Sequence, residues 1–323
     1  MSGPLWVAVI GGGQNCEREV SLASAASVRA ALDPARYVAV PLTIRPDGRW
    51  LGPAEQLLGD TPATGLAAAL GVLAGCDVVL PVVHGPRGED GALAALCELA
   101  GIPCAGSPMR AGALAMDKWV TKLVAEAVGV PTAPGRLLTS ADLPAVFTGP
   151  VVVKPVAAGS SFGVRLVETA ADFEPALRAA LELDDRVLVE QVIHGREIDV
   201  AVLDDPDFGR RTGPPLEIVL DDGLFDTTAK YDGSATFRIP PQLTEKESGE
   251  LSQAALRVYD ALGCHGVARV DFFLTPDGPV LNEVNTMPGM TAASQVPKMF
   301  GAEGLGYSEF LDRLIRATPG LLG

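Results

Sequence analysis

Three side chains with oxygen ligand atoms fall close together near the end of the chain. Asp271, Glu283 and Asn285 belong to the segments 267–274 and 279–285, which are rich in apolar and β-branched residues. Carboxylate and amide oxygens, without His or Cys, are the ligands that Mg²⁺ prefers. The alternative is an ordinary hairpin with solvent-facing charges. Because two acids and an amide stand among strongly apolar neighbours, the sequence favours a metal site.

Two β-strands joined by a tight turn must position these ligands. The sequence Thr275-Pro-Asp-Gly278 separates the two apolar segments and is typical of a hairpin turn. Side chains two residues apart lie on one face of a strand, so Arg269 accompanies Asp271, and Glu283 accompanies Asn285. The hairpin therefore predicts that the three oxygen ligands converge beside a cation.

Composition limits the class of protein and its partners. A chain of 323 residues with 48% hydrophobic and 20% charged residues is typical of a soluble globular protein of two or three domains. The net charge of −15 argues against nucleic acid or an anionic membrane as a partner. The start has no signal-peptide pattern, and Gly, Asp and Pro interrupt the apolar stretch 66–83, so no membrane span is expected.

Cysteine usage points to the compartment. The five cysteines are odd in number and show no Cys-x-x-Cys spacing; they are Cys16, Cys76, Cys97, Cys104 and Cys264. This pattern argues against a disulfide framework or a zinc site. It fits a reducing cytoplasm.

The N-terminal segment begins as a parallel βαβ unit. Residues 5–10 form a buried-type strand, Gly11-Gly-Gly13 follows, and a helix is expected from about 19 to 32. A dinucleotide-binding domain is the obvious competitor. Its Gly-x-Gly-x-x-Gly fingerprint fails at the third position, where Cys16 stands, and the acid expected on the next strand is missing. The NAD interpretation is therefore disfavoured.

Polar residues also follow the predicted strands, where open α/β sheets bind ligands. Glu17 comes after the glycine turn, and His84 closes the strand 77–83 and opens a glycine-rich loop. The alternatives are a charged first helical turn and a structural histidine.

Lysines and a loop of small residues form another candidate site. Lys118 begins a helix with Asp117 available as its cap, and Lys154 ends the strand 149–154. The following segment 157–163 is a Gly/Ser loop whose backbone N–H groups can bind phosphate. It is not a Walker A loop, because no Gly-Lys-Ser/Thr follows. The alternatives are a basic solvated helix face and an ordinary loop.

At least six separated blocks, from Val7 to Leu314, resemble the D-alanine–D-alanine ligases, a family of ATP-grasp carboxylate–amine ligases. They include Glu17-Arg-Glu-Val-Ser-Leu22, His84-Gly with Gly88-Glu-Asp-Gly91, and Asn282-Glu-Val-Asn-Thr-Met-Pro-Gly-Met-Thr291. The resemblance implies an α/β ATP-grasp fold of three domains. We expect an N-terminal substrate domain at 1–112, a central subdomain at 113–195, and a C-terminal subdomain with the metal site at 196–323.

The resemblance also implies an activity and a nucleotide site. The enzyme would join two D-alanines for peptidoglycan synthesis through an acyl phosphate, releasing ADP and phosphate. Glu190 would meet the adenine amine, and Glu197 the ribose. Two Mg²⁺ ions, with Mn²⁺ as an alternative, are assigned to Asp271, Glu283 and Asn285. The ATP-binding residues are Lys118, Lys154, Glu190, Gln191, Ile193, Glu197, Lys230 and Asn282.

The amino-acid site follows from the same resemblance. Glu17 would bind the ammonium of the first substrate, with His84 on the substrate side, and Ser294 would bind the carboxylate of the acceptor. Arg269 and the backbone N–H of Gly289 would stabilise the oxyanion of the tetrahedral intermediate.

A lid is expected over the reacting groups. In the family, the residues that match Glu17, Ser160 and Tyr231 hydrogen-bond together, which would exclude water from the acyl phosphate. The family is commonly dimeric, so a homodimer is expected.

The chain departs from the family pattern at four positions. Ala157 and Ala158 replace a basic and an acidic residue, Thr228 replaces a common Glu, and Gln295 replaces a common apolar residue. The second amino acid therefore stays open. An ATP-grasp ligase that joins another amino acid or a hydroxy acid in a specialised pathway is one alternative, although Tyr231 favours an amine. A regulatory nucleotide-binding protein is another, against which the complete set of cations and acids argues.

Overall fold

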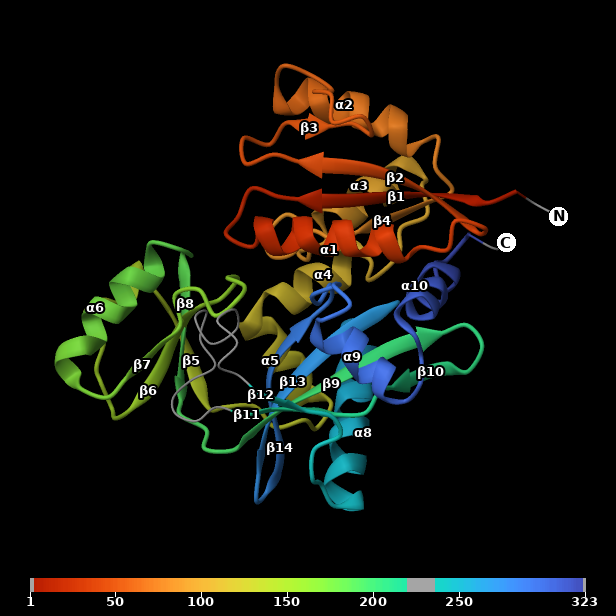
Figure 1. Ribbon diagram of the computed structural model, residues 1–323. Helices are drawn as coiled ribbons and strands as arrows, with labels where there is room; N and C mark the ends of the chain where they lie inside the picture. The colour runs from red at the N-terminus through yellow and green to blue at the C-terminus, as the bar shows by residue number, and fades with distance from the viewer. Residues whose placement is uncertain (1–2, 220–235, 322–323) are drawn as a thin grey trace.

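The computed structural model describes residues 3–219 and 236–321. These residues form three β-sheets with helices packed around them (Figure 1). Each sheet is built within one of the three segments expected from the sequence, although the boundaries between domains stay a prediction.

The first sheet lies in the N-terminal part and is covered on both faces. Its strands in spatial order are β3 (Trp50–Leu51), β2 (Tyr37–Ile44), β1 (Leu5–Gly12) and β4 (Val78–Pro81). Its helices are α1 (Arg18–Ala31), α2 (Pro62–Leu73) and α3 (Ala92–Ala100). β1 runs parallel to β2 and β4, as the predicted βαβ unit requires. Val7 and Val9 pack on the α1 side, whereas Ala8 and Ile10 pack against α2 and α3.

The second sheet is antiparallel and has an apolar core of its own. Its strands in spatial order are β5 (Gly135–Thr139), β8 (Arg186–Gln191), β6 (Val151–Pro155) and β7 (Arg165–Val167). Helix α6 (Ala170–Leu181) packs on one face, where Phe173 and Leu177 meet Val153 and Val187. This cluster is separate from the other cores, so the central part is a distinct packing unit.

The third sheet carries the predicted hairpin. Its strands in spatial order are β12 (Thr236–Arg238), β11 (Leu216–Val219), β9 (Arg196–Asp205), β13 (Val267–Thr275) and β14 (Gly278–Asn285), and β10 (Gly209–Thr212) pairs with β9. The helices packed against it are α4 (Met109–Met116), α5 (Lys118–Ala127), α8 (Glu245–Leu262), α9 (Gln295–Ala302) and α10 (Tyr307–Arg316). Strands β13 and β14 are antiparallel and joined at Thr275–Gly278, which confirms the hairpin.

The first and third parts of the chain share one hydrophobic core. Val9 and Val28 of the N-terminal part pack in the same cluster as Phe310 and Leu314 of α10. The hydroxyl of Tyr37 in β2 also donates to Asp312 in α10 at 2.6 Å. These two parts therefore pack together as one unit, whereas the central sheet has a core of its own.

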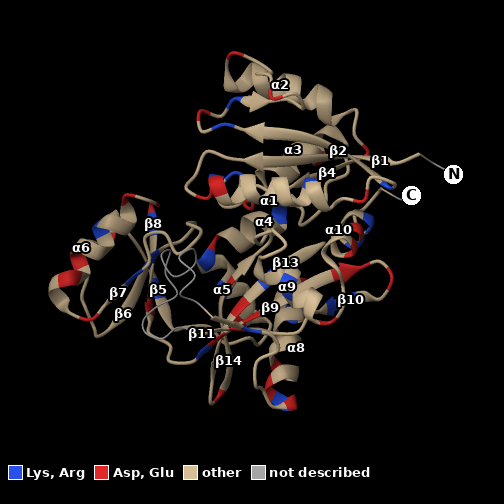
Figure 2. Cartoon of the chain, in the orientation of Figure 1, with Lys and Arg blue, Asp and Glu red and all other residues tan. Residues whose placement is uncertain are grey.

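Charge, helix hydropathy and cysteine pairing complete the description of the fold. Acidic residues occur on all three parts of the molecule (Figure 2). Over the ranges 3–219 and 236–321, no helix combines the length and apolar character needed to cross a bilayer. All five cysteines are unpaired thiols.

The N-terminal cap of α8, a helix packed against the hairpin, can be tested by mutation. Thr244 Oγ1 accepts from the N–H of Glu247, and Glu247 Oε2 accepts from the N–H of Thr244 at 2.7 Å. Thr244→Ala should lower the free energy of unfolding by about 1 kcal/mol, because an N-cap is lost. Urea unfolding followed by circular dichroism measures this change. Thr169→Ala is the matched control, since Thr169 precedes α6 without a side-chain cap; an equal loss in both variants would contradict the capping argument.

Candidate active site

Two cavities meet at the β13–β14 hairpin. One of about 730 Å³ lies between the second and third sheets, and one of about 500 Å³ lies between the N-terminal part and the third sheet. Arg269 and Glu283 line both cavities. A molecule bound in the first cavity could therefore react with one bound in the second.

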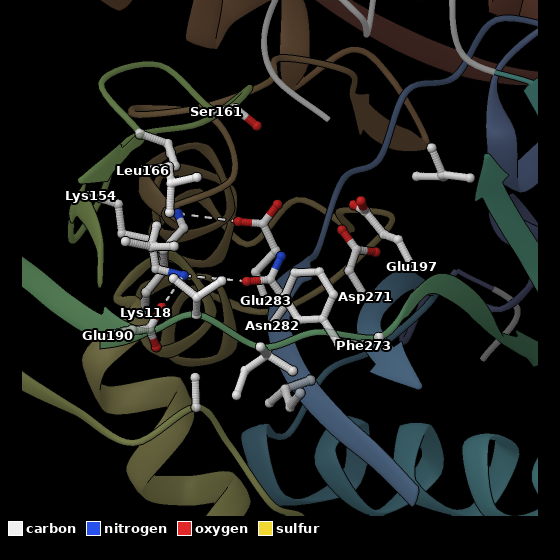
Figure 3. A pocket seen from close by; sticks show the side chains of 18 of the residues that line it. Lys118, Lys154, Ser161, Leu166, Glu190, Glu197, Asp271, Phe273, Asn282 and Glu283 are labelled. Atoms are coloured by element: carbon white, nitrogen blue, oxygen red, sulfur yellow. Dashed lines mark hydrogen bonds and ion pairs between the residues drawn. The ribbon is translucent and has the colours of Figure 1, made fainter. Parts of the chain in front are cut away.

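The predicted ligand residues converge on the hairpin. Asp271 is paired with Glu283, and Arg269 with Asn285, across the two antiparallel strands. The amide nitrogen of Asn285 donates to Asp271 at 3.0 Å. Nε and Nη2 of Arg269 donate to the two oxygens of Asp271, each at 2.7 Å. Figure 3 shows Asp271 and Glu283 pointing into the first cavity from neighbouring strands.

This arrangement has the chemistry of a site for a hard cation. Within the described part of the chain, no group of three or more His, Cys, Asp or Glu side chains could hold a metal ion. The oxygen of Asn285 would therefore complete a set of two carboxylates and one amide. The same carboxylates already attract cations, because Arg269 binds Asp271 and Lys118 Nζ lies 3.4 Å from Glu283. The residues thus fit Mg²⁺.

Three buried lysines line the first cavity: Lys118, Lys122 and Lys154. Nζ of Lys122 and Nζ of Lys154 lie 2.5 and 2.6 Å from the two oxygens of Glu190. Burial opposes ionisation of Glu190, but Lys154 and Lys122 outweigh it and hold its pKa below the usual value. The carboxylate expected at the adenine amine is therefore held between two ammonium groups.

The helix that carries two of these lysines begins as expected. Asp117 caps α5 by accepting from the N–H of Val120 at 2.9 Å. Lys118 and Lys122 are both buried, so the alternative of a solvated basic face is wrong. Lys122 had no predicted role, although its position one turn after Lys118 placed it on the same face. Burial lowers the pKa of Lys122 to about 8.

The remaining predicted nucleotide residues that the structure describes lie around the same cavity. Gln191 ends β8, and Ile193 and Glu197 line the cavity beyond it. Asn282 accepts from Lys154 at 3.3 Å. In Figure 3, Glu197 lies beside Asp271, because β9 and β13 are neighbours.

Sequence reasoning missed the ion pair at the edge of this cavity. Nε of Arg196 donates to Glu217 at 2.7 Å, and both residues line the cavity. Their charges on otherwise apolar strands were a signal that could have identified them.

Glu17 is buried at the wall of the second cavity, and one of its carboxylate oxygens has no hydrogen-bond partner in the described part of the chain. Ser160 Oγ donates to Oε1 of Glu17, so the expected contact between these residues is present. Oε2 has no hydrogen-bond partner among the described residues. A Cβ atom at Gly85 or Gly159 would lie 2.3 or 2.2 Å from that oxygen, so a larger residue at either position would displace the carboxylate. A buried carboxylate oxygen of this kind is suited to an ammonium group.

The loop that carries Ser160 adopts an unfavourable backbone conformation. Ser160 and Ser161 have φ angles of +48° and +55°, which non-glycine residues rarely adopt. The backbone carbonyl of Ala158 accepts from Lys118 at 2.7 Å, and the N–H of Ala157 donates to Asp184 at 2.7 Å. Main-chain groups of the two alanines therefore hold the loop. These contacts do not require the charged side chains that are common in the family.

His84 lines the second cavity but is already engaged by the protein. Nδ1 donates to the carbonyl of Met287 at 2.9 Å, and Nε2 pairs with Ser24 Oγ at 2.9 Å. Burial lowers the pKa of His84, so the ring is neutral and accepts through Nε2. The N–H of Met290 in turn donates to Ser24 at 3.2 Å. His84 thus fixes the segment after β14.

Glu89 is a further acid that the sequence argument did not single out. It lines the second cavity, where burial and the nearby charge of Glu17 raise its pKa to about 8. Oε2 of its carboxyl group accepts from the N–H of Gly85 at 2.9 Å and thereby supports the loop that encloses Glu17.

The last predicted residues lie at the start of α9 or outside the described ranges. Gly289 and Ser294 line the second cavity, and Ser294 Oγ accepts from the N–H of Thr291 at 3.1 Å. A Cβ at Gly289 would lie 2.9 Å from that hydroxyl, so the chain passes close to it. Lys230, Tyr231 and Thr228 lie outside the described residues.

Two family models match the chain. The model described as "D-ala D-ala ligase N-terminus" matches residues 6–107, and the one described as "D-ala D-ala ligase C-terminus" matches residues 135–316. A D-alanine–D-alanine ligase from Nocardia farcinica is 39% identical over 356 residues, with 98% of each chain covered.

Solved structures of such ligases have the same fold. The VanG D-Ala:D-Ser ligase from Enterococcus faecalis has a TM-score of 0.82 and 33% identity, with 97% of this chain and 99% of that chain covered. The D-alanine–D-alanine ligase from Bacillus anthracis, solved with ATP, has a TM-score of 0.80 and 28% identity, with 97% of each chain covered. These likenesses confirm the three-part ATP-grasp fold.

The pKa of Lys122 predicts a pH-dependent stability. Its folded value of about 8 lies below the ordinary value of 10.5, so the unfolded state binds more protons between these two pH values. Relative to Lys122→Met, the unmodified protein should therefore gain stability as the pH rises from 8 to 10.5, by up to about 1.4 kcal/mol per unit. Below pH 8 it carries the full cost of a buried charge. Urea unfolding of both proteins at several pH values tests this, and parallel curves would refute the assignment.

Proposed function

The chain belongs to the D-alanine–D-alanine ligase family, and we propose that it joins two D-alanine molecules in an ATP-dependent reaction that releases ADP and phosphate. One observation carries this proposal. A cavity lined by lysines meets a second cavity that holds the carboxylate of Glu17, at a hairpin with oxygen ligands. In this family such a product serves peptidoglycan synthesis.

The chemistry explains why two cavities must meet. A carboxylate does not react with an amine at neutral pH, because oxide is a poor leaving group. Transfer of the γ-phosphoryl group of ATP to the first D-alanine gives an acyl phosphate; the amine of the second then attacks it, and phosphate leaves. Phosphoryl transfer requires positioning and charge neutralisation more than covalent participation by the protein.

ATP would occupy the first cavity. Lys118, Lys154 and Lys230 would bind its phosphates. The carboxylate of Glu190, kept ionised by Lys122 and Lys154, would accept from the adenine amine. The backbone from Gln191 to Ile193 would line the adenine, Glu197 would bind the ribose, and Asn282 would hold Lys154 in place.

Asp271, Glu283 and Asn285 would hold two Mg²⁺ ions, which supply positive charge to the phosphates when bound; Mn²⁺ is an alternative. Arg269 and Lys118 belong to the same set of charges, because each contacts one of these carboxylates. The chain's own cations and the metal ions would therefore share these carboxylates.

The first D-alanine would occupy the second cavity. Oε2 of Glu17 is the proposed acceptor for its ammonium group, because that oxygen has no partner in the described part of the chain. His84 would act on the substrate side by fixing the segment at Met287, two residues before Gly289, whose backbone N–H would be offered to the oxyanion. Arg269 would share that role.

The acceptor and the lid complete the proposal. Ser294 would bind the carboxylate of the second D-alanine at the start of α9. Ser160 and Tyr231 would join Glu17 in closing the loop over the acyl phosphate, which shields it from water. We further propose that the enzyme works as a homodimer in the cytoplasm.

A ligase with a different acceptor is the second candidate. Gln295 lines the cavity proposed for the acceptor. The VanG D-Ala:D-Ser ligase, similar over 97% of this chain, is described as acting with D-serine. A polar residue in the acceptor's cavity favours this candidate for a specialised pathway.

Phosphate release from ATP and Mg²⁺ with single D- and L-amino acids tests the function. We expect release and dipeptide formation with D-alanine alone. Release only when D-alanine is paired with another amino acid would support the second candidate, and no release with any amino acid would contradict both. The folded variant Asp271→Asn should be inactive and serves as the control for contaminating activity.

Glu17→Gln tests the ammonium site. The variant should raise the KM for the first amino acid about 10- to 100-fold, because a hydrogen bond between charged groups is weakened, and should leave the KM for ATP nearly unchanged. Steady-state kinetics measure both constants. Glu168→Gln is the matched control, since Glu168 is exposed and lines neither cavity. A larger change in the KM for ATP would place Glu17 elsewhere in the reaction.

A further inference from the structure

Three polar side chains, of which Asp199 is buried, form a chain of hydrogen bonds beside the point where the cavities meet. Asp199 comes from β9, Arg269 from β13, and Gln295 is the first residue of α9. Nη1 of Arg269 donates to Oε1 of Gln295 at 2.6 Å, and Nε2 of Gln295 donates to Asp199 at 2.7 Å. The side chain of Asp199 is only 1% exposed, so its partners must come from the protein.

Arg269 is subject to competition between two carboxylates. Asp271 binds Nε and Nη2 at 2.7 Å each, whereas Asp199 lies 3.4 Å from Nε. The two aspartates face each other across the paired strands β9 and β13. Either could hold the guanidinium, but only the bidentate contact with Asp271 keeps it at the boundary of the two cavities.

The carboxamide of Gln295 determines which of the two aspartates binds Arg269. Its nitrogen supplies a donor to Asp199, while its oxygen accepts from the third nitrogen of Arg269. An apolar residue at this position could do neither. Asp199 would then lose the donor that Gln295 supplies and would compete more strongly for Arg269. The presence of an acid at 199 therefore explains why a polar residue is required at 295.

We propose that Asp199 and Gln295 form a matched pair of positioning residues that holds the guanidinium of Arg269 toward Asp271 and the reacting carboxyl group. This inference rests on the proposed function, in which Arg269 stabilises the oxyanion. The pair acts through Arg269, so it governs the rate of the reaction rather than the binding of ATP.

Four proteins test the pairing: the unmodified chain, Gln295→Leu, Asp199→Val and the double variant. Gln295→Leu should lower kcat about 10-fold or more and change the KM for ATP less than about twofold. The double variant should recover kcat to within about threefold of the unmodified chain, because the competing carboxylate of Asp199 is removed together with the side chain that satisfied it. A role in folding alone would not produce this recovery.

Two results would overturn the inference: an unchanged kcat in Gln295→Leu, or a double variant that is no faster than Gln295→Leu. Thermal unfolding of the same four proteins is a second measurement. If the unmodified chain releases no phosphate with D-alanine, the proposed function fails. The Tm values then test whether Asp199 and Gln295 act as a pair. A higher Tm for the double variant than for Gln295→Leu supports the pair, and an equal or lower Tm overturns it.

Discussion

Charge compensation inside the cleft is the constraint on which this structure depends. The chain carries a net charge of −15, yet it places three buried lysines and one arginine, whose side chain is 13% exposed, where two cavities meet. Isolated buried charges cost several kcal/mol each, so every cation needs a carboxylate nearby. Glu190 forms ion pairs with Lys122 and Lys154, Glu283 pairs with Lys118, and Asp271 pairs with Arg269. The charges of the site are therefore balanced before substrates bind, and the ion pairs can rearrange when phosphates bind.

The register of one hairpin makes this compensation possible. Strand β13 aims Arg269 and Asp271 to one face, and the pairing with β14 brings Glu283 and Asn285 opposite them. A slip of one residue would turn all four side chains to the face covered by α8. The irregularity after Asp271 interrupts the regular pairing beside the site. The hairpin therefore determines both the electrostatics of the cleft and its position.

Local features of the site could be predicted from the sequence, whereas contacts between distant segments could not. The hairpin, the cap at Asp117 and the strand before Lys154 depend on neighbouring residues, which periodicity and turn chemistry reveal. The contact between Ser160 and Glu17 spans most of the first half of the chain, and only resemblance to a family suggested it. The hydrogen bonds that link Arg269 to Gln295 and Gln295 to Asp199 depend on three separate elements, so no local pattern indicates them.

The distribution of hydrophobic cores explains how the site could open. The N-terminal part and the third sheet share one core, whereas the sheet that carries Lys154 has its own. Polar contacts, rather than a common core, connect that sheet to Glu17 and to Asn282. Such contacts exchange with water at low net cost, but a shared apolar core does not. The loop with two serines in left-handed conformations lies across this junction. Main-chain hydrogen bonds at Ala157 and Ala158 and the hydrogen bond to Glu17 keep the loop in this strained conformation. Loss of these few hydrogen bonds would release the loop while both cores stay packed.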